Sequence, residues 1–323
     1  MYCLIFVFSR DLLLYVSPIF VVLFLPDALA VHFLHYFIYI KVLHFFKDKN
    51  DLNGIAQFFD YYHQHLVENY GAKSELCTVH LHTHLYEQVN RHGCLSMTSC
   101  FPRESYIGNA VKWCKGHRYI LEQFNTWYKL DQLLRPDCTL NISSLTRDER
   151  FDDKYLLQSI VESFKKKFLQ CCIKKNIRSL GTNPTKIYAR YFRGLQTFHS
   201  LSYGRSGNAI SYWIAIKNDK CKKKHRICFG EVIFYFRIGD EDCYAFIKQY
   251  PCINKCLSDG LSSAAVPQNL IDRLNDYYYF FHDKKFVYKI VPVASIVNKV
   301  IRMAWMESDV SVFTEVHLDW EHD

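Results

Sequence analysis

The strongest constraint on the fold of this chain is a change of sequence pattern at Pro184. Before it, apolar residues recur every three or four positions, as over 52–70, which is typical of amphipathic helices. After it come short segments rich in aromatic and β-branched residues, separated by turn sequences such as Gly239-Asp240, which is typical of strands. The sequence therefore predicts an α+β protein, mainly α-helical at first and ending in a small antiparallel β-barrel.

The same patterns place individual elements and domain boundaries. We expect helices over 28–47, 52–70, 78–92, 119–134, 153–175 and 269–277. We expect strands over 187–192, 197–203, 211–216, 228–237, 243–249, 286–293 and 310–316. Because a polar, Asp-rich stretch at 137–153 interrupts both patterns, the predicted domains are a helical domain at 1–136, a basic helical linker at 137–184 and a β-barrel at 185–323.

Positive charge is concentrated in the middle of the chain. Residues 147–226 hold 19 Lys and Arg against 6 Asp and Glu, a net of +13, whereas the whole chain carries +8 and the remainder therefore −5. Such a segment predicts a polyanion partner, DNA or chromatin, and the alternative is a solvated surface without a ligand. The candidate phosphate contacts are Lys165, Lys166, Lys167, Lys174, Lys175, Lys222, Lys223 and Lys224.

Aromatic residues lie among these basic residues, and two interpretations are open. They could stack on nucleic-acid bases, or they could form the core of the predicted barrel, which their strand positions favour. They are Tyr188, Tyr191, Phe192, Tyr203 and Trp213.

The N-terminal stretch 12–46 is strongly apolar and has two interpretations. Pro18 and Pro26 divide it into pieces shorter than the ~20 residues that a membrane span needs, and its second part carries histidines and a lysine. We therefore expect buried helices, with a membrane anchor or signal segment as the alternative. The 13 cysteines are odd in number and irregularly spaced, which favours reduced thiols in the cytosol or nucleus.

A group of short motifs lies between residues 13 and 108. They read Leu-Leu-Tyr-Val-Ser-Pro at 13–18, His-Phe-Leu-His-Tyr at 32–36, Asn-Tyr-Gly-Ala at 69–72, Cys-Thr-Val-His-Leu-His-Thr-His-Leu at 77–85 and Phe-Pro-Arg-Glu at 101–104. Together they resemble the domain that follows the catalytic region in CACTA-type transposases. The resemblance covers about residues 12–125 and extends weakly over 185–323, as a barrel of the chromatin-reader type. Gly-Cys-Leu-Ser at 93–96 departs from the Gly-Pro-Leu-Trp of that family.

The resemblance implies functional residues. Enzymes of this superfamily hold two Mg²⁺ or Mn²⁺ ions with three carboxylates at the end of an RNase H-like core. Glu104 matches the third carboxylate, and His80 and His84 match a pair that binds a structural zinc. Cys77 lies one helical turn before His80, on roughly the same face. The other two carboxylates and a cysteine pair would precede residue 1.

A lone carboxylate cannot hold two metals, so we expect no autonomous enzymatic activity and no cofactor for this chain alone. The expected function is that of a transposon-derived fragment that binds DNA or chromatin in the nucleus or cytoplasm, with a full-length transposase as a further partner. Two alternatives remain. A longer product would be an active metal-dependent DNA strand-transfer enzyme, and an anchor at 12–46 would make the protein membrane-associated.

Overall fold

The computed structural model describes residues 12–46, 48–74, 77–98, 118–134, 149–175, 185–194, 196–204, 212–217, 227–238, 242–261, 266–307 and 309–316. The chain divides into two compact units. One comprises Met1–Ile142 and Gly260–Arg273, and the other comprises Ser143–Asp259 and Leu274–Asp323. The first is helical and the second is built on antiparallel sheets, so the predicted α+β class is confirmed.

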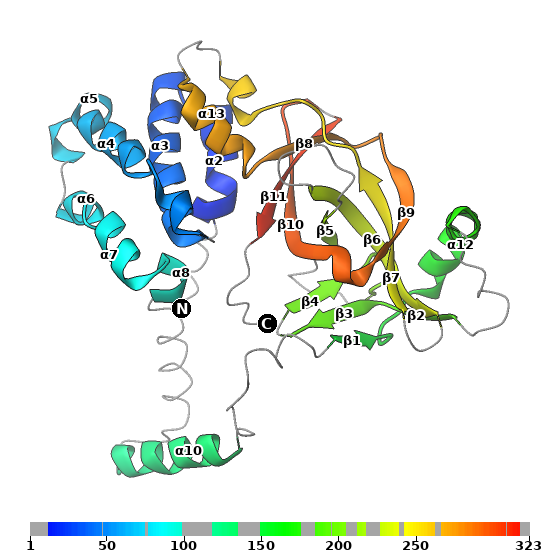
Figure 1. Ribbon diagram of the computed structural model, residues 1–323. Helices are drawn as coiled ribbons and strands as arrows, with labels where there is room; N and C mark the ends of the chain where they lie inside the picture. The colour runs from blue at the N-terminus through cyan, green and yellow to red at the C-terminus, as the bar shows by residue number, and fades with distance from the viewer. Residues whose placement is uncertain are drawn as a thin grey trace. The chain divides into compact units, whose positions relative to one another are not determined.

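The first unit consists of helices and short helical turns (Figure 1). The α-helices are α2 (Ser17–Phe24), α3 (Asp27–His44), α4 (Ala56–Gln64), α5 (Leu66–Tyr70), α6 (Cys77–His82), α7 (Leu85–His92), α8 (Leu95–Thr98) and α10 (Ile120–Leu134). The turns are η1 (Leu12–Val16), η2 (Lys49–Leu52) and η3 (Ala72–Ser74). A later helix, α13 (Gln268–Asn275), begins within the residues of this unit.

Helix α3 forms the core of this unit, which confirms the prediction of a buried helix. Its residues Leu34, Phe37 and Leu43 are completely buried. Pro26 precedes α3 with an extended backbone and separates it from α2, because the proline amide cannot continue the preceding helix. None of the helices in the described residues is both long and apolar enough to cross a membrane.

Two of the expected long helices are broken. The helix expected over 52–70 forms as α4 and α5, which meet at His65, and Gly71 ends α5 at a φ of 85° that favours glycine. The helix expected over 78–92 is interrupted between α6 and α7, where the Thr83 hydroxyl donates to the His80 carbonyl at 2.6 Å. Such local side-chain bonds compete with helical ones.

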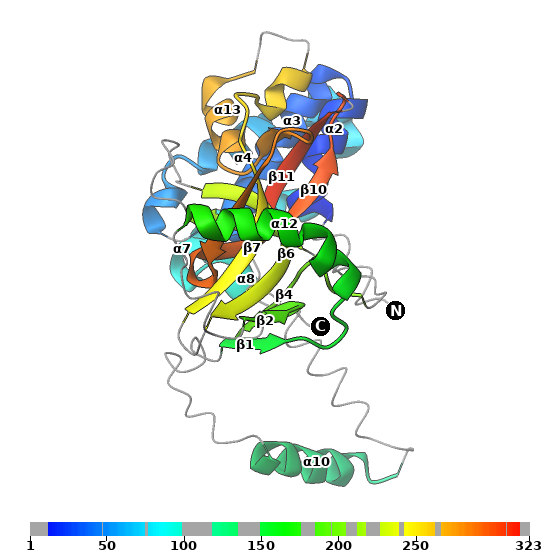
Figure 2. The same cartoon turned by 90° about the vertical axis from the view of Figure 1, so that its right-hand side faces the viewer.

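The second unit contains two antiparallel sheets and one long helix (Figure 2). Its strands are β1 (Glu149–Asp152), β2 (Thr185–Tyr188), β3 (Arg190–Arg193), β4 (Gln196–His199), β5 (Trp213–Lys217), β6 (Ile227–Ile238), β7 (Asp242–Tyr250), β8 (Tyr279–His282), β9 (Val287–Pro292), β10 (Ile296–Ala304) and β11 (Val310–Val316). The helix is α12 (Gln158–Lys174), and short turns lie at η5 (Leu257–Gly260) and η6 (Val293–Ser295). The segment expected as a linker thus contributes β1 and α12 to this unit.

The larger sheet is curled into about half a barrel (Figure 1). Its strand order is β8-β11-β10-β5-β6-β7-β9, with β2 added beside β6. The two end strands, β8 and β9, are joined only by residues 283–286, so the sheet must curl to bring its ends together there. The segment after β7 also reaches β8, because the Ile253 amide donates to the Phe280 carbonyl at 2.8 Å. The smaller sheet has the order β1-β3-β4.

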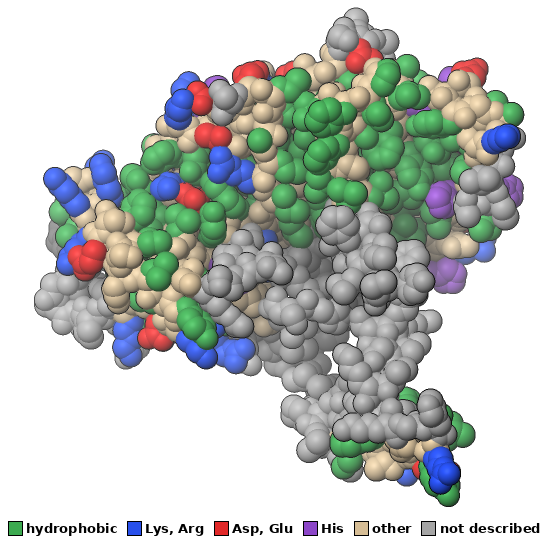
Figure 3. Space-filling view, turned by 180° about the vertical axis from the view of Figure 1, so that it is seen from behind, with side chains coloured by type: hydrophobic (Ala, Val, Ile, Leu, Met, Phe, Trp, Pro, Cys, Tyr) green, Lys and Arg blue, Asp and Glu red, His purple; other side chains and the backbone are tan. Residues whose placement is uncertain are grey.

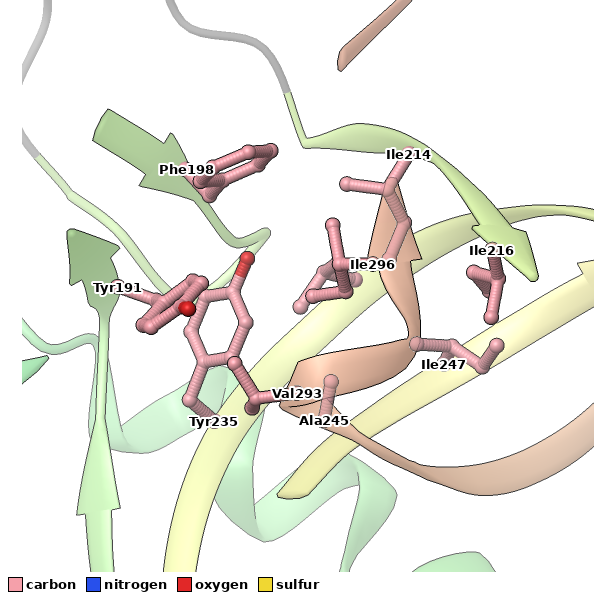
Figure 4. Packing of buried hydrophobic residues seen from close by; sticks show 10 residues of the cluster. Tyr191, Phe198, Ile214, Ile216, Tyr235, Ala245, Ile247, Val293 and Ile296 are labelled. Carbon is pink, nitrogen blue, oxygen red and sulfur yellow. The ribbon is translucent and has the colours of Figure 1, made fainter. Parts of the chain in front are cut away.

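A buried cluster holds the two sheets together (Figure 4). Tyr191 and Phe198 of the small sheet pack with Tyr235 of β6, whose ring centroid lies 5.8 Å from that of Tyr191. Ile214 and Ile296 of the large sheet complete one side of the cluster. Alternation along each strand puts these residues on the inner face, and their burial is the main force that stabilises the unit.

Candidate nucleic-acid interface

Helix α12 carries most of the described candidate contacts, and its apolar face fixes its position. Val161, Phe168 and Cys172 recur at helical spacing and are buried against the large sheet. The Phe168 ring lies 4.9 Å from that of Phe236 and 5.2 Å from that of Phe234, in edge-to-face geometry. The helix is therefore held firmly, and its remaining sides face solvent.

The lysines of α12 do not all share one side of the helix. Successive residues are rotated by about 100°, so Lys165, Lys166 and Lys167 diverge, whereas Lys167 and Lys174 are seven residues apart and point the same way. Lys166 is rotated by about 80–100° from both and points toward the centre of the solvent face. All three lysines are exposed, and we call the aligned pair Lys167 and Lys174 the basic stripe. In Figure 3, Lys and Arg side chains gather at the margin where α12 lies.

Lys165 belongs to a different surface. Its Nζ lies 3.1 Å from Glu162 Oε2, and both side chains are 61% exposed, so this pair adds little stability but reduces the net charge there. Between the directions of Lys165 and Lys166, α12 exposes the apolar Leu169 and Ile173, at 44% and 77%. Lys175 is exposed at the helix end, where the free carbonyls favour positive charge.

The two adjacent cysteines of α12 are not reactive thiolates. Burial raises the pKa of the Cys171 thiol, although Lys174 and Lys167 act in the opposite direction. Burial also raises the pKa of Cys172 to about 11, and the neighbouring Cys171 adds to this effect. Both thiols therefore stay protonated at neutral pH, and they act as packing groups.

The residues matched to a zinc site are only partly described. The rings of His80 and His84 lie 5.3 Å apart between centroids, and both are exposed. Cys77 begins α6, and its side chain, like the whole of Glu104, lies outside the described residues. Within the described ranges, no three His, Cys, Asp or Glu side chains come together in a way that could hold a metal. His82 hydrogen-bonds to the Tyr36 hydroxyl at 3.3 Å, and burial lowers its pKa.

No protein-family model matches this chain. No curated protein and no solved structure matches it either.

Most of the aromatic residues that lie among basic residues belong to the core. Tyr191 is completely buried, Tyr203 and Trp213 are 8% exposed, and Tyr188 packs against the cluster of Figure 4. The core interpretation is confirmed for these four. Phe192 is half-buried on the outer face of the small sheet, beneath the guanidinium groups of neighbouring arginines.

Sequence reasoning missed the arginines that pack on aromatic rings. The guanidinium carbon of Arg190 lies 5.2 Å from the Phe192 ring centroid and 4.9 Å from that of Tyr203, and Arg190 also pairs with Asp152. In the large sheet, Arg302 lies over Trp213. Except for Arg190 and Phe192, which are two residues apart on β3, these partners are distant in sequence, and no local signal could have found them. The predicted contacts Lys222, Lys223 and Lys224 lie outside the described residues.

Proposed function

We propose that this chain is a transposon-derived protein that binds DNA, free or in chromatin, through the basic stripe of α12. The observation that carries the proposal is the pair Lys167 and Lys174, which lie one above the other on a helix anchored by a separate, apolar face. On the solvent side of α12, the residues next to them in direction are Ser163 and Gln170, which are uncharged and do not repel a phosphate. The stripe is therefore ready to follow a phosphate backbone.

Binding of this kind is independent of base sequence, because the stripe offers ammonium groups and no group directed to bases. Each lysine that neutralises a phosphate releases counterions and adds about 0.9 to the slope of log affinity against log salt. Two contacts would lower the affinity by about 12-fold between 50 and 200 mM salt.

The test compares lysine-to-glutamine variants at positions on two different sides of α12. Binding of a labelled DNA duplex would be followed by fluorescence anisotropy over a range of salt concentrations. The Lys167→Gln/Lys174→Gln variant should lower the salt slope by about 1.8 and weaken binding. The matched control, Lys165→Gln, should change binding much less, because Lys165 lies on another side and is paired with Glu162.

Two results would contradict this assignment. Equal losses in Lys165→Gln and in each of the single variants Lys167→Gln and Lys174→Gln would mean that only total charge matters. Wild-type binding that does not change with salt would mean that the lysines do not contact phosphates.

The origin and the catalytic state of the chain are proposed from the motif resemblance alone. In this proposal the helical unit is the last part of an RNase H-like core, the half-barrel is a chromatin-reader-like module, and a full-length transposase is a further partner. Glu104, His80, His84 and Cys77 would be remnants of metal sites, and the chain would neither cut nor join DNA.

A further inference from the structure

A pocket of about 520 Å³ opens beside strands β5, β10 and β11 in the second unit. Its lining includes two tryptophans, one arginine, two acidic residues and a serine: Trp213, Trp305, Arg302, Asp283, Glu307 and Ser311. The size is that of a site for one small organic group, and the mixture of flat rings with a few polar groups is typical of such sites.

The side chain of Arg302 is fixed in one orientation by three contacts. Its guanidinium carbon lies 5.0 Å from the Trp213 ring centroid, its Nε donates to Ser311 Oγ at 3.0 Å, and its Nη2 lies 2.9 Å from Asp283 Oδ2. The side chain is nevertheless 39% exposed. Because Trp213, Ser311 and Asp283 each contact part of the guanidinium group, its exposed remainder is available to the pocket that Arg302 lines. The pocket thus presents the flat surface of a guanidinium group. Because the Arg302 side chain is already held in place, it loses little conformational entropy when a ligand binds.

The charges in and around the pocket balance. Asp283 pairs with Arg302, and Glu307 pairs with Lys255. A cationic ligand would be repelled by Arg302, which already occupies the face of Trp213. An anionic ligand would meet two carboxylates. The lining therefore favours a neutral, planar group that carries both hydrogen-bond donors and acceptors.

We propose that this pocket binds one unpaired nucleobase, stacked on the guanidinium plane of Arg302. Bases stack readily on arginine, and their edges offer donors and acceptors to the carboxylates of Asp283 and Glu307 and to Nη1 of Arg302. The site differs from the basic stripe in position and in chemistry, since it binds a base and not a phosphate. It does not depend on the lysines of α12.

The test uses the tryptophans of the pocket as reporters. The full chain would be titrated with adenosine and with cytidine, which are uncharged, and tryptophan fluorescence would be excited where nucleosides do not absorb. Both should quench the emission saturably, ribose should not, and raising the salt should leave the affinity unchanged, because the ligand is neutral. Lys167→Gln/Lys174→Gln should bind nucleosides like the wild type, so loss of DNA binding in that variant is a separate result.

The discriminating variant is Arg302→Lys, which keeps the charge and removes the flat surface. It should bind nucleosides about tenfold more weakly, with an unchanged circular dichroism spectrum. Undiminished affinity in this variant, or no saturable quenching of the wild type at millimolar nucleoside, would overturn the proposal. If Arg302→Lys does not fold, Trp305→Phe serves instead: its quenching should be smaller in amplitude, and an identical amplitude would place the ligand elsewhere.

Discussion

His32 and His35 of α3 are almost fully buried, at 1% and 3% exposure, among the tyrosines of α4. Nδ1 of His35 donates to the Val31 carbonyl at 2.8 Å, and its ring lies 4.0 Å from that of Tyr61. Nε2 of His32 donates to the Tyr62 carbonyl at 2.8 Å. Burial lowers the pKa of both histidines below the ordinary 6.5, and the neighbouring His65 acts in the same direction.

We expect the helical unit to lose stability in mild acid. Because the folded pKa values lie below 6.5, the unfolded chain takes up protons first; the stability is complete above pH 6.5 and decreases as the pH falls below it. Urea unfolding followed by the helical signal at about pH 7.5 and about pH 5.5 measures this loss. His35→Phe should make the pH dependence shallower.

The control for this experiment is His92→Gln, at an exposed position near the end of α7, which should leave the pH dependence as it is. If His35→Phe responds to acid as strongly as the wild type does, the buried ring of His35 is not the cause.

At the scale of single elements, the position of α12 depends strongly on one buried residue, Phe168. The Phe168 ring contacts Phe234, Phe236 and Phe246, with centroids 4.9 to 5.4 Å away. Its burial stabilises the same arrangement that exposes Lys167 and Lys174. The position of the basic stripe therefore depends on the packing of the apolar face.

Phe168→Ala should destabilise the second unit by about 3–5 kcal/mol, because it removes a large buried ring and leaves a cavity. Ile173→Ala, at an exposed position on the same helix, should change the free energy of unfolding by less than about 0.5 kcal/mol. Denaturant unfolding followed by tryptophan fluorescence gives both values. A loss below about 1 kcal/mol for Phe168→Ala would mean that α12 is not held by this contact.

The sequence predicted most elements, and those that it missed have a common reason. Periodicity identified α3, α10, α12 and the long strand β6 to within a few residues. It missed β1, β8 and β10 and merged β2 with β3, because a short or bent strand differs little from a loop until its partners are known. Composition likewise identified the lysines of α12, whereas only helical geometry separates the basic stripe from Lys165.

At the scale of the whole chain, the large sheet forms the pocket around Arg302, which no local sequence pattern predicts. Trp213 and Arg302 come from the paired strands β5 and β10, and Asp283 follows β8, which is linked to β10 through β11, so they meet only through the pairing of strands that are far apart in the sequence. The basic stripe could be predicted from a run of charges, and the pocket could not, because it depends on long-range strand pairing. The metal-site residues were expected from the resemblance, and of that set the structure describes the side chains of His80 and His84.

If the chain is transposon-derived, as proposed, the number of its matching carboxylates limits what it can do to DNA. Strand transfer needs two metal ions, and these need several carboxylates in one place, whereas Glu104 is the residue of this sequence that matches the proposed pattern. We therefore expect the purified chain, with Mn²⁺ and a supercoiled plasmid, to bind the DNA without nicking it. Electrophoresis of the plasmid after incubation measures this. The matched control is Glu104→Gln, and nicking by the wild type that disappears in this variant would mean that Glu104 forms a working metal site together with residues that do not match the family pattern.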